Sequence, residues 1–419
     1  MSPSWMQDDM KIVFVARLFM SSARALAGVT TPVYLALLGF SAFKLGLFFV
    51  CVALGSALIS SAVGLLSDRI GRRPFLIALP LAAGFAAVLF SATSDTTLLF
   101  VAASVGTFGR GAGAGAGAVG PYQPAESALV TELCAPHDRN SVFTRLAVVS
   151  SLGAVLGGLL ALLAGGGHPS PAQALTLFRP AFLVAAALSI VAGVIALWIK
   201  EPAHTPREVG EKRRVRFPVR SRALLYRLWI TNSVNGVAIG MIGPFIAYWF
   251  YRRFDASAGE IGVLFAVINL TTAFTTLSAS SFARRFGLVR TVTFVRTIQA
   301  LLLVPMALAP TFETAGALYL LRMIVQRVGM PLRQSYVLAI ADPEERASVT
   351  ALSNLPSQFA MAASPTLTGL LFDEVSLSLP FELAAALQLC NTTLFWGFFH
   401  RILPEEEDPD YEPVDEDPD

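Results

Sequence analysis

Long apolar stretches recur along the 419-residue chain and are separated by short polar loops. A helix needs about 20 residues to cross the hydrocarbon core of a bilayer. Twelve stretches come close to that length, at residues 12–38, 45–66, 75–92, 98–119, 144–165, 180–198, 225–250, 259–282, 291–309, 314–334, 349–371 and 381–401. Hydrocarbon offers the backbone no water, and the sequence lacks the short alternating segments of a membrane barrel. The pattern therefore predicts an all-α membrane protein with twelve transmembrane helices.

The longest internal polar stretch, residues 200–223, lies between the sixth and seventh spans. It divides the chain into two expected six-helix bundles, residues 1–199 and 224–403, joined by a cytoplasmic linker. The last sixteen residues, 404–419, hold ten Asp and Glu and four Pro. Such a composition cannot bury a core, so we expect a disordered acidic tail. A solvated tail is favoured, and a partner-binding or regulatory role stays open.

The two halves carry a weak internal repeat. Pro124, Pro136 and Arg139 recur as Pro331, Pro343 and Arg346, each 207 residues later. Both copies follow the fourth span of their half, which is the place that two parallel six-helix repeats predict. We therefore expect two pseudo-symmetric bundles related by duplication.

Composition and charge support a membrane location and set its orientation. Hydrophobic residues make up 54% and charged residues 14% of the chain, against about 25% charged in soluble domains. Loops on the side of the termini carry eighteen Lys and Arg, and the opposite loops carry four. The positive-inside rule then predicts a multi-pass protein of the inner or plasma membrane with both termini in the cytoplasm. The three cysteines show no metal-ligand spacing, and no removable signal peptide is expected.

The loop between the second and third spans has the sequence GLLSDRIGRR, residues 64–73. Glycine at 64 permits close helix packing, glycine at 71 permits a tight turn, and an aspartate can sit at the positive amino end of a helix. The loop resembles the signature motif of the major facilitator superfamily. The matching residues are Gly64, Asp68, Arg69, Gly71, Arg72 and Arg73.

That resemblance implies a conformational latch. In the family, the aspartate docks on the eleventh helix and the arginine four residues later reaches an acid at the end of the fourth. Carried to this sequence, these are Asp68 and Arg72, with Glu132 as the acid. The second-half copy, residues 283–290, has Arg284 where the aspartate would stand, so a second latch of equal strength is not expected.

Several ionisable residues fall inside the predicted spans, where charge is costly and usually faces a cavity or a partner. Arg110 resembles the fourth-helix arginine of proton-coupled exporters of the family, although Ala114 and Ala116 replace the glycines that follow it there. In the family, helices one, four, seven and ten line the central cavity, so Arg24, Arg110 and Arg322 are expected to form a cationic lining. Such a lining suits an anionic or polar solute; structural pairing of each arginine is the alternative. The candidate cavity residues are Arg24, Arg110, Glu126, Asn232, Asn235, Arg322, Gln326 and Arg327.

Glu126 and Arg333 each lie two residues after the repeated proline of their half. Their equivalent positions predict an ion pair that closes the cytoplasmic gate. A role for Glu126 in proton coupling, as a partly buried carboxylate, is the alternative.

These observations predict a secondary active transporter that works by alternating access, with proton-coupled efflux of a small organic molecule or metabolite as the first choice. Transport of an organic anion bound by intramembrane arginines is one alternative, and a non-transporting membrane receptor or scaffold is another. An enzyme is not expected, because the spans lack clustered catalytic side chains. We expect no catalytic residues, metal or cofactor, a monomer in the lipid bilayer, a small solute and protons as partners, and no nucleic acid.

Overall fold

The computed structural model describes residues 8–109, 120–165, 171–201, 218, 220–276, 288–342 and 345–400. Over these residues the chain is helical and contains no strand. The first half consists of α1 (Asp8–Leu37), α2 (Ala42–Ile70), α3 (Arg73–Ala92), α4 (Thr96–Gly106), α5 (Tyr122–Leu133), η2 (Pro136–Asp138), α6 (Arg139–Leu160), η3 (Ala161–Ala164), α7 (Pro171–Ile195) and η4 (Ala196–Trp198).

The second half consists of α8 (Arg222–Ile242), α9 (Ile246–Phe254), α10 (Ala258–Thr276), α12 (Leu288–Leu301), α13 (Leu303–Ala307), α14 (Phe312–Ile340), α15 (Arg346–Ser353), α16 (Leu355–Glu374) and α17 (Leu379–Phe399). When α4 with α5, α8 with α9, α12 with α13 and α15 with α16 each count as one span, and the short 3-10 turns are left out, the predicted twelve-helix architecture is confirmed. Most of the predicted linker and the whole of the predicted tail lie outside the described residues.

Polar side chains fix where several helices begin. Asp95 accepts a hydrogen bond from the Leu98 amide at the start of α4 (2.9 Å), and Ser41 accepts one from Lys44 at the start of α2. Thr311 and Thr314 form a reciprocal capping box at the start of α14. Each device satisfies amide groups that have no partner inside the helix.

Some spans are less regular than predicted. The fourth span was expected to be continuous over residues 98–119, but α4 ends at Gly106 and Thr107 adopts a left-handed conformation with φ of 49°. The seventh span bends by 43° between α8 and α9. Six helices alone, and a seventh when α8 and α9 count as one, are long and apolar enough to cross a membrane within the described part of the chain. Two of the remaining spans contain shorter apolar helices, Thr96–Gly106 and Ala258–Phe274, within the described residues.

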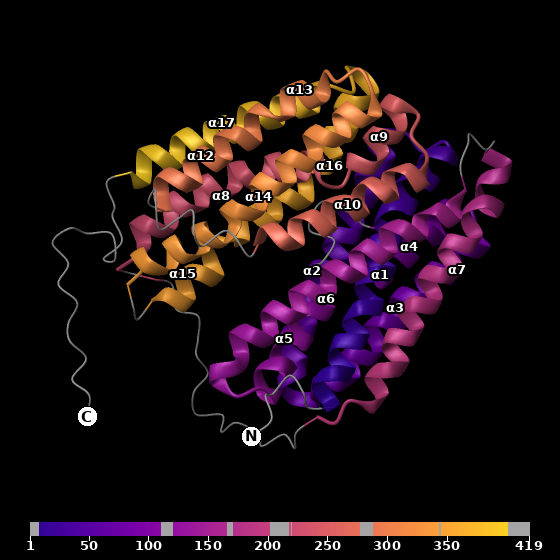
Figure 1. Ribbon diagram of the computed structural model, residues 1–419, viewed down its shortest axis with the longest axis horizontal. Coiled ribbons are helices and arrows are strands. Elements are labelled where there is room, and N and C mark those ends of the chain that lie inside the picture. Colours follow the sequence, from indigo (N-terminus) through magenta and orange to yellow (C-terminus); the bar gives the residue numbers. More distant parts are fainter. Residues whose placement is uncertain are drawn as a thin grey trace.

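The two bundles are in contact at one end and lie apart at the other (Figure 1). We call the end where α7 finishes and α8 begins the linker end, and the opposite end, where α2 begins, the far end. Figure 1 shows the bundles meeting near α9 and diverging towards α5 and α15. The two halves are in contact where α2 packs against α16, where α10 packs against α6 and η3, and where α9 packs against α1.

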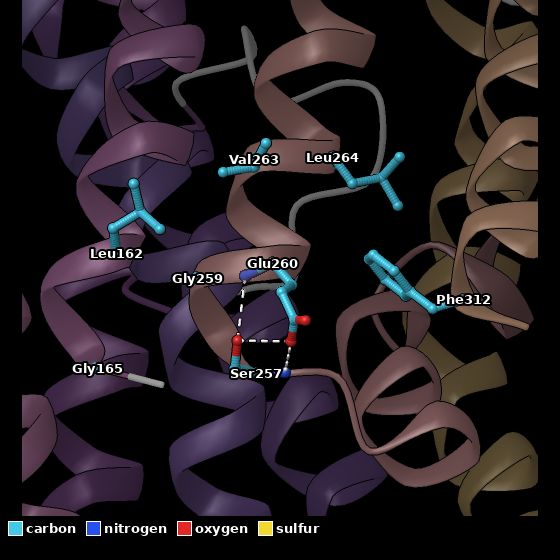
Figure 2. Close-up of a pocket in the computed structure, with 8 residues that line it drawn as sticks. All are labelled: Leu162, Gly165, Ser257, Gly259, Glu260, Val263, Leu264 and Phe312. Carbon is cyan, nitrogen blue, oxygen red and sulfur yellow. Dashed lines mark hydrogen bonds between the residues drawn. The ribbon is translucent and has the colours of Figure 1, made fainter. Parts of the chain in front are cut away.

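A pocket of about 380 Å³ lies at the far end beside the contact between η3 and α10 (Figure 2). Its wall is mostly apolar and includes Leu162, Val263 and Phe312. The one carboxylate in the wall, Glu260, accepts hydrogen bonds from the Ser257 amide and hydroxyl, both at 2.8 Å. Glu260 therefore caps its own helix.

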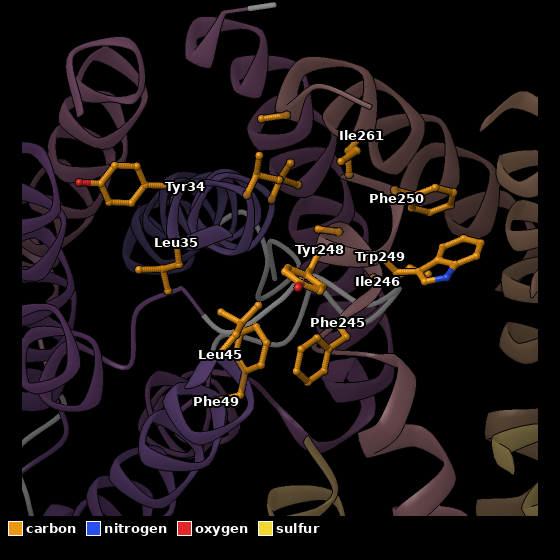
Figure 3. Packing of buried hydrophobic residues seen from close by; sticks show 14 of the residues in the cluster. Tyr34, Leu35, Leu45, Phe49, Phe245, Ile246, Tyr248, Trp249, Phe250 and Ile261 are labelled. Carbon is orange, nitrogen blue, oxygen red and sulfur yellow. The ribbon is translucent and has the colours of Figure 1, made fainter. Parts of the chain in front are cut away.

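The buried apolar residues explain the shape. One cluster contains residues of both halves at the far end, where for example the Phe49 and Phe245 rings pack edge to face with centroids 5.3 Å apart (Figure 3). Towards the linker end the cluster that contains Met10 and Tyr122 belongs to the first half alone, and the cluster that contains Tyr336 and Phe399 belongs to the second half alone. The protein therefore has one shared core at the far end and separate cores at the linker end.

Candidate functional site

A buried ion pair joins the first and fourth spans of the first half. Arg17 of α1 pairs through its Nη1 with Oε2 of Glu126 on α5, and the two residues are 6% and 0% exposed. Arg17 also donates from Nε to the Ser150 hydroxyl at 3.1 Å, and Ser150 lies 2.9 Å from the Ser21 hydroxyl. The second Glu126 oxygen, Oε1, is buried without a hydrogen-bond partner among the described residues.

The second half has a related tie with different chemistry. Arg333 of α14 donates from Nη2 to the side-chain Oδ1 of Asn232 on α8, and Asn232 Nδ2 donates to the Ser353 backbone carbonyl at 2.6 Å. Because the halves repeat at an offset of 207 residues, Glu126 and Arg333 occupy equivalent positions. Each binds the first helix of its own half, so the structure does not bring them together. The predicted Glu126–Arg333 gate pair would require both side chains to exchange partners.

The predicted cationic lining is distributed over both halves. Arg24 lies 3.4 Å from both the carbonyl and the hydroxyl of Thr107, beside a small cavity that also contacts Ser189. Arg322 is 4% exposed on α14. Arg110 lies outside the described residues, and Asn235 and Arg327 are half-buried on α8 and α14.

Three polar residues follow one face of α14. Arg322, Gln326 and Arg333 are spaced by four and seven residues, so they stack along the helix. Arg322 Nε, Gln326 Oε1 and Arg333 Nε are each buried without a hydrogen-bond partner in the part of the chain that the structure describes. Buried polar atoms of this kind are rare and need an explanation. We call these three residues the α14 polar face.

The residues of the GLLSDRIGRR loop build a compact corner at the linker end. Arg72 forms an ion pair with Glu132 at the end of α5, as the family resemblance implies. The amides of Arg72 and Arg73 donate to the two carboxylate oxygens of Glu201, at 2.6 and 3.2 Å. Gly71 has φ of +89°, and an added Cβ would lie 2.7 Å from Glu201, so glycine is required there. The side chains of Asp68 and Arg69 lie outside the described set, and the latch role remains a prediction.

The far end is closed by glycines and by one carboxylate. A Cβ on Gly46 of α2 would lie 2.4 Å from the Pro365 carbonyl on α16, and one on Gly262 of α10 would lie 2.3 Å from the Gly158 carbonyl on α6. Asp373 at the end of α16 accepts hydrogen bonds from the amides of Ala42 and Phe43 at 2.9 and 2.8 Å. One half therefore caps a helix of the other.

Replacing Asp373 with Asn should weaken the closed far end, because charge-assisted bonds to a helix amino terminus are lost. A cost of about 1 kcal/mol would change the ratio of closed to open far ends about fivefold. Spin-label distances between introduced cysteines at Arg179 and Arg253 would measure it. Glu374→Gln, one residue further on, is the matched control, and an equal effect of both substitutions would contradict the capping role.

Comparison with known proteins identifies the family. The family model described as Major Facilitator Superfamily matches residues 13–231 and 228–416. The chain belongs to the major facilitator superfamily. The chain is 23% identical over 401 residues to an uncharacterized membrane protein of Saccharomyces cerevisiae, covering 87% of this chain and 88% of the relative. It is 26% identical over 356 residues to the Multidrug resistance protein MdtH of Edwardsiella ictaluri, covering 81% of each.

Solved structures agree on the fold. The crystal structure of the nucleoside transporter NupG superposes with a TM-score of 0.74 at 12% identity, covering 94% of this chain and 99% of that chain. At this identity the likeness concerns the fold alone. The chain is thus a multi-pass membrane protein of a transporter family, which implies a lipid bilayer and small solutes as its partners.

Two arginines of this superfamily member were not among the candidates from the sequence. Arg17 lies inside the first predicted span, seven residues before Arg24, and this two-turn spacing places both arginines on one face of the helix. Arg296 lies inside the ninth predicted span and is described below. An arginine within an apolar span was a sufficient signal in both cases.

Proposed function

We propose that this protein is a secondary active transporter that works by alternating access and exports a small organic molecule or metabolite in exchange for protons. The observation that carries the proposal is the distribution of the cores: one apolar cluster joins the halves at the far end, whereas the clusters at the linker end belong to single halves. Two rigid bundles with this arrangement can rock about a central site and open to either side in turn.

Orientation follows from charge. The linker end carries the excess of Lys and Arg described above. We therefore place the linker end and both termini on the cytoplasmic side of the inner or plasma membrane. The described conformation is then open inward. Similarity to a relative named Multidrug resistance protein supports export of small organic molecules.

We assign proton coupling to Glu126. Its carboxylate is fully buried, one of its oxygens has no hydrogen-bond partner among the described residues, and its one ion-pair partner there is Arg17. Uptake or loss of a proton would break or restore that pair, which joins α1 to α5. A proton-dependent change in this tie gives a route from protonation to bundle movement.

Transport by purified protein in vesicles tests the proposal. With an imposed proton gradient, wild type should move at least one compound from a library of small organic molecules and metabolites against its concentration gradient. Glu126→Gln should reduce gradient-driven accumulation to the level of protein-free vesicles. Because glutamine keeps the size but cannot titrate, solute exchange at equal pH should survive. Gradient-driven accumulation that persists in Glu126→Gln would remove Glu126 from coupling, and no movement by wild type would contradict transport itself.

A second candidate is transport of an organic anion, favoured by the α14 polar face. Arg322 is nearly fully buried, and no ion pair to it exists among the described residues. An anionic solute would supply the missing charge. Comparing uptake of carboxylates with that of their neutral amides would separate the two candidates.

A further inference from the structure

A second group of arginines, Arg296 and Arg333, lies half-buried in the second half, nearer the linker end than Arg322. Arg333 on α14 donates to Asn232 on α8, as described above. Next to Asn232, the Thr231 carbonyl accepts from the Asn391 amide on α17 at 2.7 Å, and Asn391 in turn accepts from Arg296 Nη1 on α12 at 2.5 Å, in the amide orientation that satisfies both neighbours. Four helices thus converge on what we call the arginine cluster: Arg296, Arg333, Asn232 and Asn391.

The cluster holds two positive charges and no negative one. The Arg296 and Arg333 guanidinium groups interact electrostatically with each other. Every Asp and Glu of the second half whose placement is described lies at a helix end or in a loop: Asp255, Glu260, Glu313, Asp342, Glu345, Asp373, Glu374 and Glu382. Among the described residues, the contacts of the two charges are with neutral amides and with the Phe395 ring, 5.6 Å from Arg296.

In the first half, the arginine at the equivalent level has an acidic partner. There Arg17 meets Glu126, and the equivalent of Glu126 in the second half is Arg333. The repeat has therefore replaced an acid with a base at this level. Holding like charges together away from water without a counter-charge is costly, and no carboxylate among the described residues of the second half offsets these two charges.

We propose that the arginine cluster binds one anionic group, a carboxylate or a comparable oxyanion, that enters from the opening at the linker end. Arg333 lies seven residues before the end of α14, roughly 10 Å along the helix from the linker end. Its buried Nε still lacks a partner and can donate to an oxyanion, and guanidinium forks match carboxylates in geometry. The α14 polar face continues from Arg333 to Arg322. This proposal rests on the proposed transport function in taking the anionic group as part of a solute.

Binding to the full-length protein in detergent tests the site without requiring transport. In a low-chloride buffer, wild type should bind benzoate saturably by calorimetry and should not bind benzamide, its neutral analogue. Arg296→Gln and Arg333→Gln should each weaken benzoate binding about tenfold or more, because a hydrogen bond to a charged group is lost. Arg253→Gln, an exposed arginine at the far end, should bind as wild type does.

Thermal stability provides a readout with opposite signs for a binding site and a structural cluster. Without added anion, Arg296→Gln should raise the melting midpoint, since it removes a repulsion, and benzoate should stabilise wild type more than the variant. A lowered midpoint, together with unchanged benzoate binding, would show a structural cluster and overturn the proposal. If a glutamine variant does not fold, Arg296→Lys keeps the charge, loses the fork and should bind benzoate more weakly than wild type.

Competition identifies the source of the anion. Displacement of benzoate by sulfate or chloride at similar concentrations would indicate an inorganic anion, and resistance to both would indicate the carboxylate of a solute. Failure of benzoate, sulfate and chloride to bind wild type would overturn the site. Benzoate binding without transport in vesicles would support the anion site and contradict the proposed transport function. Transport without benzoate binding would support the transport function and contradict the anion site.

Discussion

Replacing Arg17 with glutamine is expected to lower the free energy of unfolding by about 3–5 kcal/mol, the usual cost of removing one partner from a buried ion pair. Glu126 is fully buried, and Arg17 supplies the ion pair to its Oε2. In the variant, the carboxylate would keep its burial and lose its cation. The thermal midpoint of the purified protein measures the loss, and transport in vesicles should fall with it.

The double variant Arg17→Gln with Glu126→Gln should recover most of the lost stability, because two amides can hydrogen-bond without any buried charge. It should not recover proton-driven transport. Arg179→Gln, an exposed arginine of the same half, is the matched control and should melt as wild type does. A double variant as unstable as the single one would show that Arg17 acts through Ser150 and packing instead of through Glu126.

Hydropathy predicts the fold well because apolar runs report directly on the surrounding solvent. It does not predict the breaks within spans. Thr107 adopts a left-handed backbone and the seventh span bends by 43° between α8 and α9, yet a span-length hydropathy average stays apolar across both breaks, although Arg110 and Pro244 lie beside them. A backbone turn changes hydrogen bonding without changing side-chain hydrophobicity, so an average over a window misses it.

The site was predictable where a short motif fixes it. Arg72 and Glu132 were identified through the loop resemblance, and they lie together in the structure. Other partners are separated by 109 residues for Arg17 with Glu126 and by 101 residues for Arg333 with Asn232. Pairings at such separations depend on how helices pack and turn, which spacing along one helix does not determine. The repeat predicts that Glu126 and Arg333 are equivalent, but equivalence alone could not show that each binds within its own half.

One end of α2 packs closely against the other half and the other end does not, and this difference leads to a prediction about the conformational equilibrium. An added Cβ on Gly46 would lie 2.4 Å from the Pro365 carbonyl of the other half, whereas one on Gly64 would meet nothing within 4 Å. Gly46→Val should therefore disfavour the closed far end by about 1–3 kcal/mol, a typical cost of overpacking. Gly64→Val should be tolerated in the described state. Because Gly64 opens the motif that resembles the family latch, its substitution should hinder closure of the linker end instead.

Both substitutions should reduce transport at least tenfold, since alternation requires both closures, but they should move the protein in opposite directions. Spin labels at Arg179 and Arg253 report on the far end, and labels at Asn140 and Ala223 report on the linker end, with Cys51, Cys134 and Cys390 replaced beforehand. Gly46→Val should lengthen the far-end distance and shorten the linker-end distance. Gly64→Val should keep the linker-end distance long. Because 1–3 kcal/mol corresponds to about a 5- to 150-fold change in the population ratio, the shift should be visible directly in the distance distributions. If both variants lost transport with distances unchanged from wild type, the glycines would serve local packing, and closure through α2 would have to be abandoned.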